Sequence, residues 1–324
     1  MRKPLRIGTR ESQLAVWQAT RVQELLAENN IPSELVYIKS EGDIDLQTPL
    51  YDMGVQGIFT RSLDIALLAD RIDLAVHSMK DVPTQLPKGI VQAAVLERAS
   101  YKDILVFKGD SSSIYEQLAL TGNRGTPVQD STNVAAPFTI ATSSIRRKAQ
   151  WLNRYPGHII ENLRGNVNTR LRKVAEQPWQ GAIFAAAGLE RIGLRPTRSI
   201  DLDWMLPAPA QGAIVAVCRE SDAETLQQCK LFNHQDTALC ALIERDFLRA
   251  LLGGCSTPIS ALAQVSGDKV HFRGNILSVN GTEKVDIERT ALLSEATNIG
   301  KIAAAELLSN GGQKIADGIR NELK

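Results

Sequence analysis

Apolar residues along the first two-thirds of the chain alternate between two spacings. Short continuous runs, which are typical of buried strands, are followed by segments in which apolar residues recur every three or four positions, as in helices. The first helical segment can be capped by Ser12, and its apolar face consists of Leu14, Trp17, Val22, Leu25 and Leu26. The expected strands cover residues 5–8, 35–38, 74–76, 90–96, 104–107, 138–141, 159–160, 182–185 and 213–218. Strands that alternate with helices predict an α/β fold with helices on both faces of the sheet.

The pattern changes after about residue 235. A helical segment follows and ends at Gly253-Gly254, which is a helix-stop signal. Further along, Asn280-Gly281 between two alternating runs is typical of a hairpin. The expected elements are a helix over residues 239–252, strands over residues 270–277 and 285–287, and a last helix over about residues 295–308. We therefore expect a small α+β domain with an antiparallel sheet at the end of the chain.

The composition is that of an ordinary globular protein. A chain of 324 residues exceeds what one core usually holds, so two or three domains are expected. The 37 Lys and Arg nearly balance the 36 Asp and Glu, so net charge gives no reason to expect a nucleic acid partner. The sequence shows neither a secretory signal nor an apolar run long enough to cross a bilayer. Its cysteines lack metal-ligand spacing, so we expect a reduced, cytoplasmic protein with neither a membrane partner nor a metal.

Basic and hydroxyl side chains follow five of the expected strands. Ligands of open α/β sheets bind beyond the carboxyl ends of the strands, so these side chains are expected to meet in one crevice. So many cations would repel one another unless an acidic ligand joined them, and Arg can grip a carboxylate with two hydrogen bonds. We predict a site for a small molecule with several carboxylates or phosphates. The candidates are Arg10, Ser12, Ser78, Lys80, Thr142, Ser144, Arg146, Arg147, Arg164, Arg170 and Arg191.

An alternative is that these Arg residues lie on solvated helix faces and pair with nearby Glu. For a single residue such as Arg170, both interpretations stay open. For Arg146 and Arg147, which directly follow Thr142-Ser143-Ser144, ligand binding is the favoured interpretation.

Asp81 is an acid among cations, so it is expected to stay ionised. It can then stabilise a developing cation or pass a proton to a leaving amine, or it can serve only as a helix cap. His77 can form part of the crevice wall, and Lys80 can be a surface charge. A Schiff base on Lys80 is not favoured, because nothing nearby indicates a burial that would lower its pKa.

Cys255 lies between Gly253-Gly254 and Ser256-Thr257-Pro258. A loop that is flexible on one side and held by proline on the other suits an accessible thiol that carries a covalent group, although the residue pattern alone leaves this role open. The other cysteines, Cys218, Cys229 and Cys240, lie in apolar patterns and are expected to be small core residues.

At these residues the sequence resembles the hydroxymethylbilane synthase (porphobilinogen deaminase) family over nearly its whole length. No single motif would support this resemblance, but their number and order make it specific. The matching segments are RIGTR at residues 6–10, VHSMKDVP at 76–83, TSSIRR at 142–147, LRGNVNTR at 163–170, PAQG at 209–212 and GGC at 253–255.

The resemblance implies a transferase of tetrapyrrole and haem biosynthesis. In that family a cysteine, here Cys255, holds a dipyrromethane primer through a thioether; four porphobilinogen units are added with loss of ammonia, and hydroxymethylbilane is released by hydrolysis. The first two domains resemble the halves of a periplasmic anion-binding protein. We expect domain 1 at residues 1–98 with 213–230, domain 2 at 99–212 and domain 3, which carries Cys255, at 231–324.

The resemblance also assigns roles to the candidates. Each porphobilinogen carries an acetate and a propionate, and the basic and hydroxyl candidates above, together with Gln211, match the family's partners for these groups. Asp81 matches the catalytic aspartate, which handles the pyrrole nitrogens and steadies a cationic azafulvene intermediate.

The chain departs from the family in two places. Asp52 and Gln56 stand in a flap segment where the family often or usually has Lys, which leaves Arg61 as a nearby cation. The stretch between residues 121 and 137, rich in Gly, Pro, Asn, Thr and Ser, predicts a loop or insertion that is longer than usual, with no role assigned.

Two other classes of function remain to be separated. A non-catalytic anion-binding protein would explain the Arg residues but not Cys255. A transferase that pairs a Cys255 nucleophile with His77 would explain the thiol but not the convergent cations. We expect a monomer, and only the synthase should carry two pyrrole units on Cys255.

Overall fold

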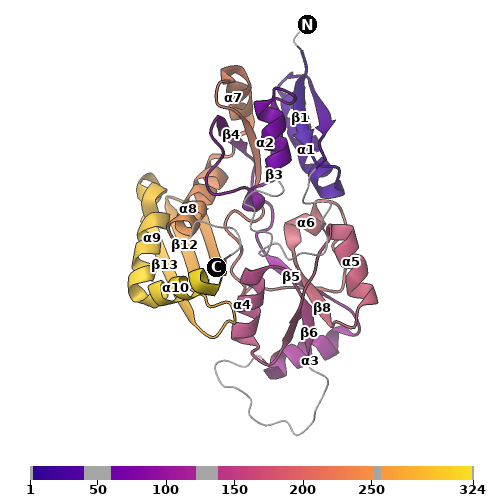
Figure 1. Cartoon of the computed structure of the whole chain (residues 1–324), viewed down its shortest axis with the longest axis vertical. Coiled ribbons are helices and arrows are strands. Elements are labelled where there is room, and N and C mark those ends of the chain that lie inside the picture. The colour runs from indigo at the N-terminus through magenta and orange to yellow at the C-terminus, as the bar shows by residue number, and fades with distance from the viewer. Residues whose placement is uncertain (1–2, 40–59, 122–137, 252–256, 323–324) are drawn as a thin grey trace.

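The structure is a computed structural model, and it describes residues 3–39, 60–121, 138–251 and 257–322. Three separate sheets organise the molecule, and Figure 1 shows them as an upper, a lower and a lateral unit. Two of the sheets have five strands each and carry helices on both faces, whereas the third is a three-stranded antiparallel sheet. The described chain is therefore an α/β protein with a small α+β unit at its C-terminal end, as the sequence pattern predicts.

The first sheet has the strand order β2-β1-β3-β10-β4. β1, β2 and β3 run parallel, and β10 is antiparallel to both of its neighbours. Leu74 and Val76 face the core under α1, while Ala75 faces the core under α2, so the alternation along β3 requires a helix on each face. The elements are β1 (Leu5–Thr9), α1 (Gln13–Glu28), β2 (Ser33–Tyr37), α2 (Arg61–Leu68), β3 (Leu74–Ser78), the 3₁₀ turn η2 (Met79–Asp81), β4 (Ile90–Val95), β10 (Ile214–Arg219) and α7 (Ala223–Cys229).

The second sheet has the order β7-β6-β8-β5-β9. β6 is parallel to β7 and β8, whereas β5 is antiparallel to both β8 and β9. Its two cores are built around Trp151 on one face and Trp179 on the other. The elements are β5 (Asp103–Phe107), α3 (Ser111–Thr121), β6 (Thr139–Ala141), α4 (Ile145–Arg154), β7 (Ile159–Glu161), α5 (Val167–Glu176), β8 (Gly181–Ala185), α6 (Ala186–Glu190) and β9 (Ser199–Asp201).

The third unit packs helices against one antiparallel sheet. Phe247 and Phe272 meet edge to face at 5.1 Å in its core, and Gly274 gives the Phe247 ring the space that a Cβ atom would fill. The Asn280-Gly281 hairpin joins β12 to β13 as expected. The elements are α8 (Gln235–Leu251), β11 (Ile259–Ser266), β12 (Lys269–Leu277), β13 (Lys284–Leu292), the 3₁₀ segment η4 (Leu293–Asn298), α9 (Ile299–Leu307), the π turn η5 (Leu308–Gly312) and α10 (Gln313–Glu322).

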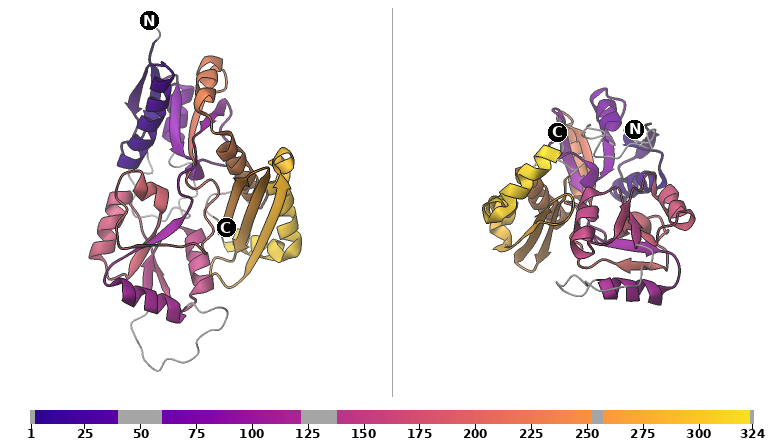
Figure 2. Two further views of the ribbon diagram at one scale, coloured as in Figure 1. Left: turned by 180° about the vertical axis from the view of Figure 1, so that it is seen from behind. Right: turned by 60° about the horizontal axis from the view of Figure 1, so that its bottom comes forward.

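Two chain segments cross between the first and second sheets, from β4 to β5 and from β9 to β10. They touch where the Ala99 N–H donates to the Gly212 carbonyl at 3.1 Å. Gly212 has φ +86°, and a Cβ atom there would lie 2.7 Å from the carbonyl oxygens of Ala99 and Ser100, so only glycine fits this close approach. Figure 2 shows the ribbon of the crossing from two further sides. We call residues 96–102 and 202–213 the hinge segments.

One buried carboxylate joins this hinge to the third unit. Glu244 of α8 is fully buried and pairs with Arg98 through two hydrogen bonds of 2.7 Å. The same carboxylate accepts from the backbone N–H groups of Ala210 at 2.6 Å and Ala263 at 2.7 Å. Both hinge segments and β11 therefore meet at one side chain.

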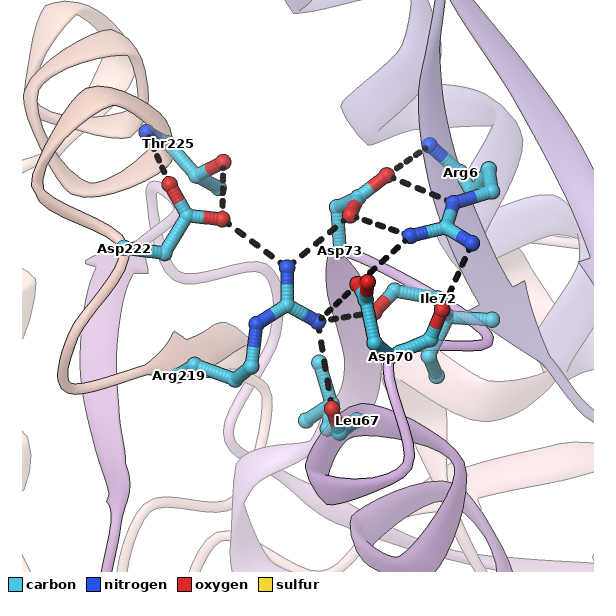
Figure 3. Close-up of polar contacts among 8 residues, drawn as sticks. All are labelled: Arg6, Leu67, Asp70, Ile72, Asp73, Arg219, Asp222 and Thr225. Carbon is cyan, nitrogen blue, oxygen red and sulfur yellow. Dashed lines mark hydrogen bonds and ion pairs between the residues drawn. The ribbon is translucent and has the colours of Figure 1, made fainter.

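A second polar network fixes the returning strand β10 in the first sheet (Figure 3). Arg219, the last residue of β10, bonds to Asp73 at 3.0 Å and to Asp222 at 3.1 Å. Asp73 also accepts from Arg6 of β1 at 2.8 and 2.9 Å. These cations lower the pKa of Asp73 although its partial burial raises it, so the carboxylate stays charged.

Several elements were not expected from the sequence. They are α3, α6, α7, β9, β11 and α10. The expected last helix over residues 295–308 is instead a 3₁₀ segment followed by α9. The chain bends at Gly311, where φ is +102°, and then continues into α10. The helical region therefore does not end near residue 308, where the sequence pattern placed its end. The expected domain boundaries stay a prediction. In the described residues, no helix has the length and apolarity needed to cross a membrane.

Candidate functional site

Arg10, Ser78 and Asp81 line one pocket at the end of the first sheet, together with Gln18 and His77. They come from the ends of β1 and β3 and from α1, where the sequence placed the crevice. Asp81 is exposed to solvent and Arg10 is half-buried. An exposed acid and a cation therefore share one wall of this pocket.

Hydroxyl groups in this pocket have defined partners. Ser78 Oγ accepts a hydrogen bond of 2.8 Å from Gln18 Nε2, so its own proton is available to a ligand. Ser12 caps α1, because its side chain accepts from the Ala15 N–H at 3.4 Å. Gln18 is a residue that sequence reasoning missed, because a glutamine on a helix face carries no distinctive signal.

His77 is buried, and its Nε2 has no hydrogen-bond partner. Burial and the nearby charge of Arg10 lower the pKa of His77 to about 3. The imidazole is therefore neutral near pH 7, so it does not add a charge to the crevice wall.

On the opposite side, polar groups follow β6 and cap α4. Ser144 accepts from the Arg147 N–H at 3.4 Å, and Thr142 Oγ1 accepts from the Ser144 N–H at 3.2 Å. Thr142 is buried, and Ser144 is half-buried. This hydrogen-bonded turn starts α4 so that Arg146 and Arg147 are in its first turn.

Arg146 and Arg147 both bind the buried carboxylate of Asp103. Arg146 Nη2 donates to Oδ2 at 2.7 Å, and Arg147 donates to Oδ1 from Nη2 at 2.7 Å and from Nε at 3.1 Å. Burial raises the pKa of Asp103, but the two guanidinium groups lower it more, so the carboxylate stays ionised. Asp103 was not among the residues expected from the sequence, because one acid at the start of an apolar run is also what a strand boundary looks like.

Lys80 approaches the same cluster through Gln211, whose Oε1 lies 3.3 Å from Lys80 Nζ. Burial and the charge of Arg147 lower the pKa of Lys80 to about 8, despite the opposing effect of Asp81. The expectation that nothing nearby would lower this pKa is therefore wrong, because the fold buries the amino group of Lys80 and brings the charge of Arg147 near it. Gln211 is buried and lies on the hinge segment before β10.

Arg164 and Arg170 lie at the start of α5, where Asn166 caps the helix. Arg164 is buried, and Arg170 Nε donates to the Gly165 carbonyl at 2.7 Å. Burial and the charges of Arg147 and Arg164 lower the pKa of Arg170 to about 10, although Asp81 opposes this. The structure thus places Arg170 among the other cations and near Asp81 rather than on a solvated face.

Arg191 directly follows α6 and contacts both the segment before β10 and α1. Its Nη2 donates to the Gly212 carbonyl at 2.7 Å, and its guanidinium lies 5.7 Å from the centre of the Trp17 ring. Burial lowers its pKa to about 10. Gln13 and Asn168 also bond at 3.1 Å, so α1 touches the second α/β unit on this side.

Cys255, Asp52 and Gln56 lie outside the described residues, as does most of the stretch from 121 to 137. Cys218, Cys229 and Cys240 are buried, which confirms their expected place in the core. Burial raises the pKa of the Cys218 and Cys240 thiols to about 11, so these are poor nucleophiles.

The helix that leads toward Cys255 is held against the Asp81 turn. Arg245 of α8 donates to the carbonyl groups of Met79 at 3.2 Å and Val82 at 2.9 Å. α8 ends at Leu251, four positions before Cys255 in the sequence. Among the described residues, no group of His, Cys, Asp and Glu could hold a metal ion.

Comparison with known proteins gives a consistent result. Residues 5–227 match the family described as porphobilinogen deaminase, dipyromethane cofactor binding domain, and residues 238–309 match its C-terminal domain. A porphobilinogen deaminase of Syntrophomonas wolfei is 40% identical over 96% of this chain and 97% of its own, and one of Geobacter sulfurreducens is 39% identical over 96% and 93%. An ancestral cationic amino acid solute-binding protein overlaps 71% of this chain and 87% of its own at 13% identity, with a TM-score of 0.41. The chain therefore belongs to the porphobilinogen deaminase family.

Proposed function

We propose that the protein is a hydroxymethylbilane synthase, which joins four porphobilinogen molecules into a linear tetrapyrrole. The observation that carries this proposal is the excess of positive charge in the crevice beside one accessible acid. Lys80, Arg146 and Arg147 surround a single buried carboxylate, and Asp81 stands exposed nearby. An acidic substrate that becomes cationic during the reaction needs both features.

The residues present fit a dipyrromethane primer. Its carboxylates match a donor set of guanidinium, ammonium and hydroxyl groups, and the buried Nε of Arg146 has no partner within the protein. We propose that Arg146, Arg147, Thr142 and Ser144 hold this group, and that Cys255 attaches it. When bound, the primer supplies the terminal pyrrole carbon to which a new unit is joined.

Asp81 is the proposed catalytic residue. Ammonia leaves the aminomethyl carbon of porphobilinogen with the electron pair of the broken C–N bond, so positive charge develops on the pyrrole ring. A carboxylate near the ring nitrogen stabilises that charge and can take the proton released when the new C–C bond forms. The surrounding Arg residues are satisfied by substrate carboxylates and leave Asp81 as the anion for the ring.

Arg10, Ser12, Ser78 and Lys80 are proposed to bind the incoming porphobilinogen from the side of the first sheet. The remaining cations, Arg164, Arg170 and Arg191, would hold its carboxylates from the side of the second sheet, and Gln211 would orient Lys80. Each charge-assisted hydrogen bond contributes on the order of 1.5–3 kcal/mol. Several such contacts explain how a small, strongly hydrated acid can be retained.

Intact-mass measurement tests the function directly. Wild-type protein is expected to carry the mass of two porphobilinogen units less two molecules of ammonia, whereas Cys255→Ser is expected to fold, to lack this mass and to make no tetrapyrrole. Cys218→Ser is the matched control and should keep both the added mass and the activity. Turnover by Cys255→Ser at the wild-type rate would refute the attachment; an unmodified, inactive wild-type protein would favour an anion-binding protein instead.

We also propose that the protein is a cytoplasmic monomer with domains at residues 1–98 with 213–230, 99–212 and 231–324. The proposal is supported by the sheet membership of β10 and by the free, buried thiols of Cys218, Cys229 and Cys240. Light scattering coupled to size-exclusion chromatography should give the mass of one chain. A mass of two chains would contradict the proposed monomer.

A further inference from the structure

Asp103 lies at the centre of the basic cluster, yet it belongs to no motif that the sequence analysis singled out. It is the first residue of β5 and is fully buried. Its Oδ2 accepts from Arg146, and its Oδ1 accepts from Arg147 and, at 2.9 Å, from Gln211 Nε2. Both carboxylate oxygens thus face side chains of the protein, so Asp103 acts on its neighbours rather than on a ligand.

Gln211 extends this arrangement to a third cation. Its Nε2 donates both hydrogens, one to the Tyr101 carbonyl at 2.7 Å and one to Asp103. The amide therefore has one orientation, with Oε1 directed at Lys80 Nζ. Consequently, the position of Asp103 also determines where the acceptor for Lys80 lies.

The charges of the cluster do not balance. Lys80, Arg146 and Arg147 contribute three positive charges and Asp103 one negative charge, which leaves two in excess. Without Asp103, three like charges would face one another in a region of low dielectric constant. Asp103 holds the three cations together, and a net positive charge remains to bind carboxylates.

We propose that Asp103 is a positioning residue that holds Arg146 and Arg147 directly, and Lys80 through Gln211, in the geometry that receives the carboxylates of primer and substrate. The inference rests on the proposed function, which assigns these cations to acidic groups. It also spans the crevice, because Asp103 starts the second sheet, Lys80 follows β3 of the first, and Gln211 lies on the hinge segment between them.

The first test compares Asp103→Asn with Asp201→Asn. The control removes a paired carboxylate from the neighbouring strand β9, where Asp201 binds Lys102 and Arg195 away from the cluster. One charge-assisted contact corresponds to about tenfold or more in affinity. Asp103→Asn should therefore lower the fraction of protein that carries primer, and the KM of the primed fraction for porphobilinogen should rise by about tenfold. Asp201→Asn should keep both. Wild-type occupancy and KM in Asp103→Asn would overturn the inference.

The second test separates positioning from a merely structural role. The extent of acetylation of Lys80 is measured against pH by peptide mass spectrometry. Removing the charge of Asp103 takes away one group that raises the pKa of Lys80, so the midpoint should move below that of the wild type. Loosened packing would expose Lys80 and move the midpoint upward, toward that of an ordinary lysine, and this result would overturn the inference.

Gln211→Met decides the question if Asp103→Asn does not fold. This variant keeps both Arg pairs on Asp103 and removes the hydrogen bonds that Gln211 makes to Asp103, to the Tyr101 carbonyl and to Lys80. It should therefore retain primer, raise the KM and lower the Lys80 midpoint. A wild-type KM and midpoint would contradict the proposed relay. The acetylation profile needs no turnover, so it reports on the cluster even if wild-type protein proves inactive and the proposed function fails.

Discussion

The two acids of the crevice have opposite surroundings, and this difference separates their chemistry. Asp103 is fully buried and accepts hydrogen bonds from two Arg residues and from Gln211. Asp81 is exposed in a pocket that it shares with Arg10 and Ser78. A carboxylate that is saturated by the protein stabilises its neighbours, whereas an accessible one can meet a charge that forms on a ligand.

We predict that Asp81→Asn keeps its primer and its fold but loses most of kcat. The amide has nearly the size of the carboxylate and no charge, so ground-state contacts persist while stabilisation of the developing cation is lost. Intact mass and steady-state kinetics provide the measurement, with Glu190→Gln as an exposed acidic control. A change in KM with an unchanged kcat would make Asp81 a binding residue only.

The KM of the wild-type enzyme is predicted to rise above pH 8. The pKa of Lys80 is lowered to about 8, so Lys80 is charged below this pH and becomes neutral as the pH rises through it. A neutral amine attracts a substrate carboxylate less. Lys80→Arg retains a charged group over this range, so its KM should stay level up to about pH 9. Parallel KM profiles for the two proteins would contradict the prediction.

Single residues of the site differ in how visible they are in the sequence. Arg146 and Arg147 stand out because they follow a hydroxyl-rich turn after a strand. Asp103 does not, because one acid at the start of an apolar run looks like a strand boundary. The lowered pKa of Lys80 also cannot be derived from sequence, since it depends on burial and on a cation 67 positions further along the chain, Arg147.

At the scale of elements, the sequence predicts the helices and strands that have a regular apolar pattern and a residue that signals where they begin or end. α1 has both features, and Ser12 caps it as expected. β11 has neither, because Ser260 and the alanines at 261 and 263 are buried without forming an apolar alternation. α10 was missed because Asn310, Gly311 and Gly312 resemble a helix end, whereas the chain bends there and continues.

Glu244 on α8 provides a prediction at this scale. Glu244→Gln keeps the size of the side chain but replaces one acceptor oxygen by a donor. Arg98 then loses its counter-charge and one of its two hydrogen bonds, and one backbone N–H, of Ala210 or Ala263, loses its acceptor. Breaking a buried ion pair in this way costs about 3–5 kcal/mol of the free energy of unfolding. Urea denaturation followed by circular dichroism would measure the loss.

The matched control for this variant is Glu306→Gln. Glu306 pairs with Arg289 on the surface, where the side chain of Glu306 is 35% exposed and that of Arg289 is 43% exposed. Exposed pairs contribute about 0–1 kcal/mol, so this variant should unfold near the wild-type midpoint. Equal losses in the two variants would show that the hinge does not depend on the buried pair.

For the whole molecule, the buried histidines predict a loss of stability in mild acid. Burial lowers the pKa of His158 to about 4, and burial with the charge of Arg10 lowers that of His77 to about 3. Both values lie below the ordinary 6.5, so the unfolded chain binds more protons as the pH falls. This contribution to stability is complete above pH 6.5 and is lost progressively toward pH 4 and below.

A variant without the His158 imidazole tests this sign. His158 Nδ1 accepts from Trp151 Nε1 at 3.1 Å, which requires an unprotonated nitrogen, and His158→Gln keeps an acceptor that does not titrate. The variant should be less stable than the wild type at pH 7.5, and the gap in melting temperature should narrow between pH 6.5 and 4. A gap that widens on acidification would contradict the assignment.

The place of β10 sets an order for the biosynthesis of the chain. β10 fills the gap between β3 and β4, yet residues 214–219 leave the ribosome only after all strands of the second sheet. The second α/β unit is contiguous and can fold first, while the nascent N-terminal unit waits with two unpaired strand edges, which are open to wrong pairing. Arg219 then anchors the late strand to Asp73, beside Arg6 of the first strand made (Figure 3). A transcript truncated before codon 214 would therefore yield a chain in which the second α/β unit can fold but the N-terminal unit lacks β10.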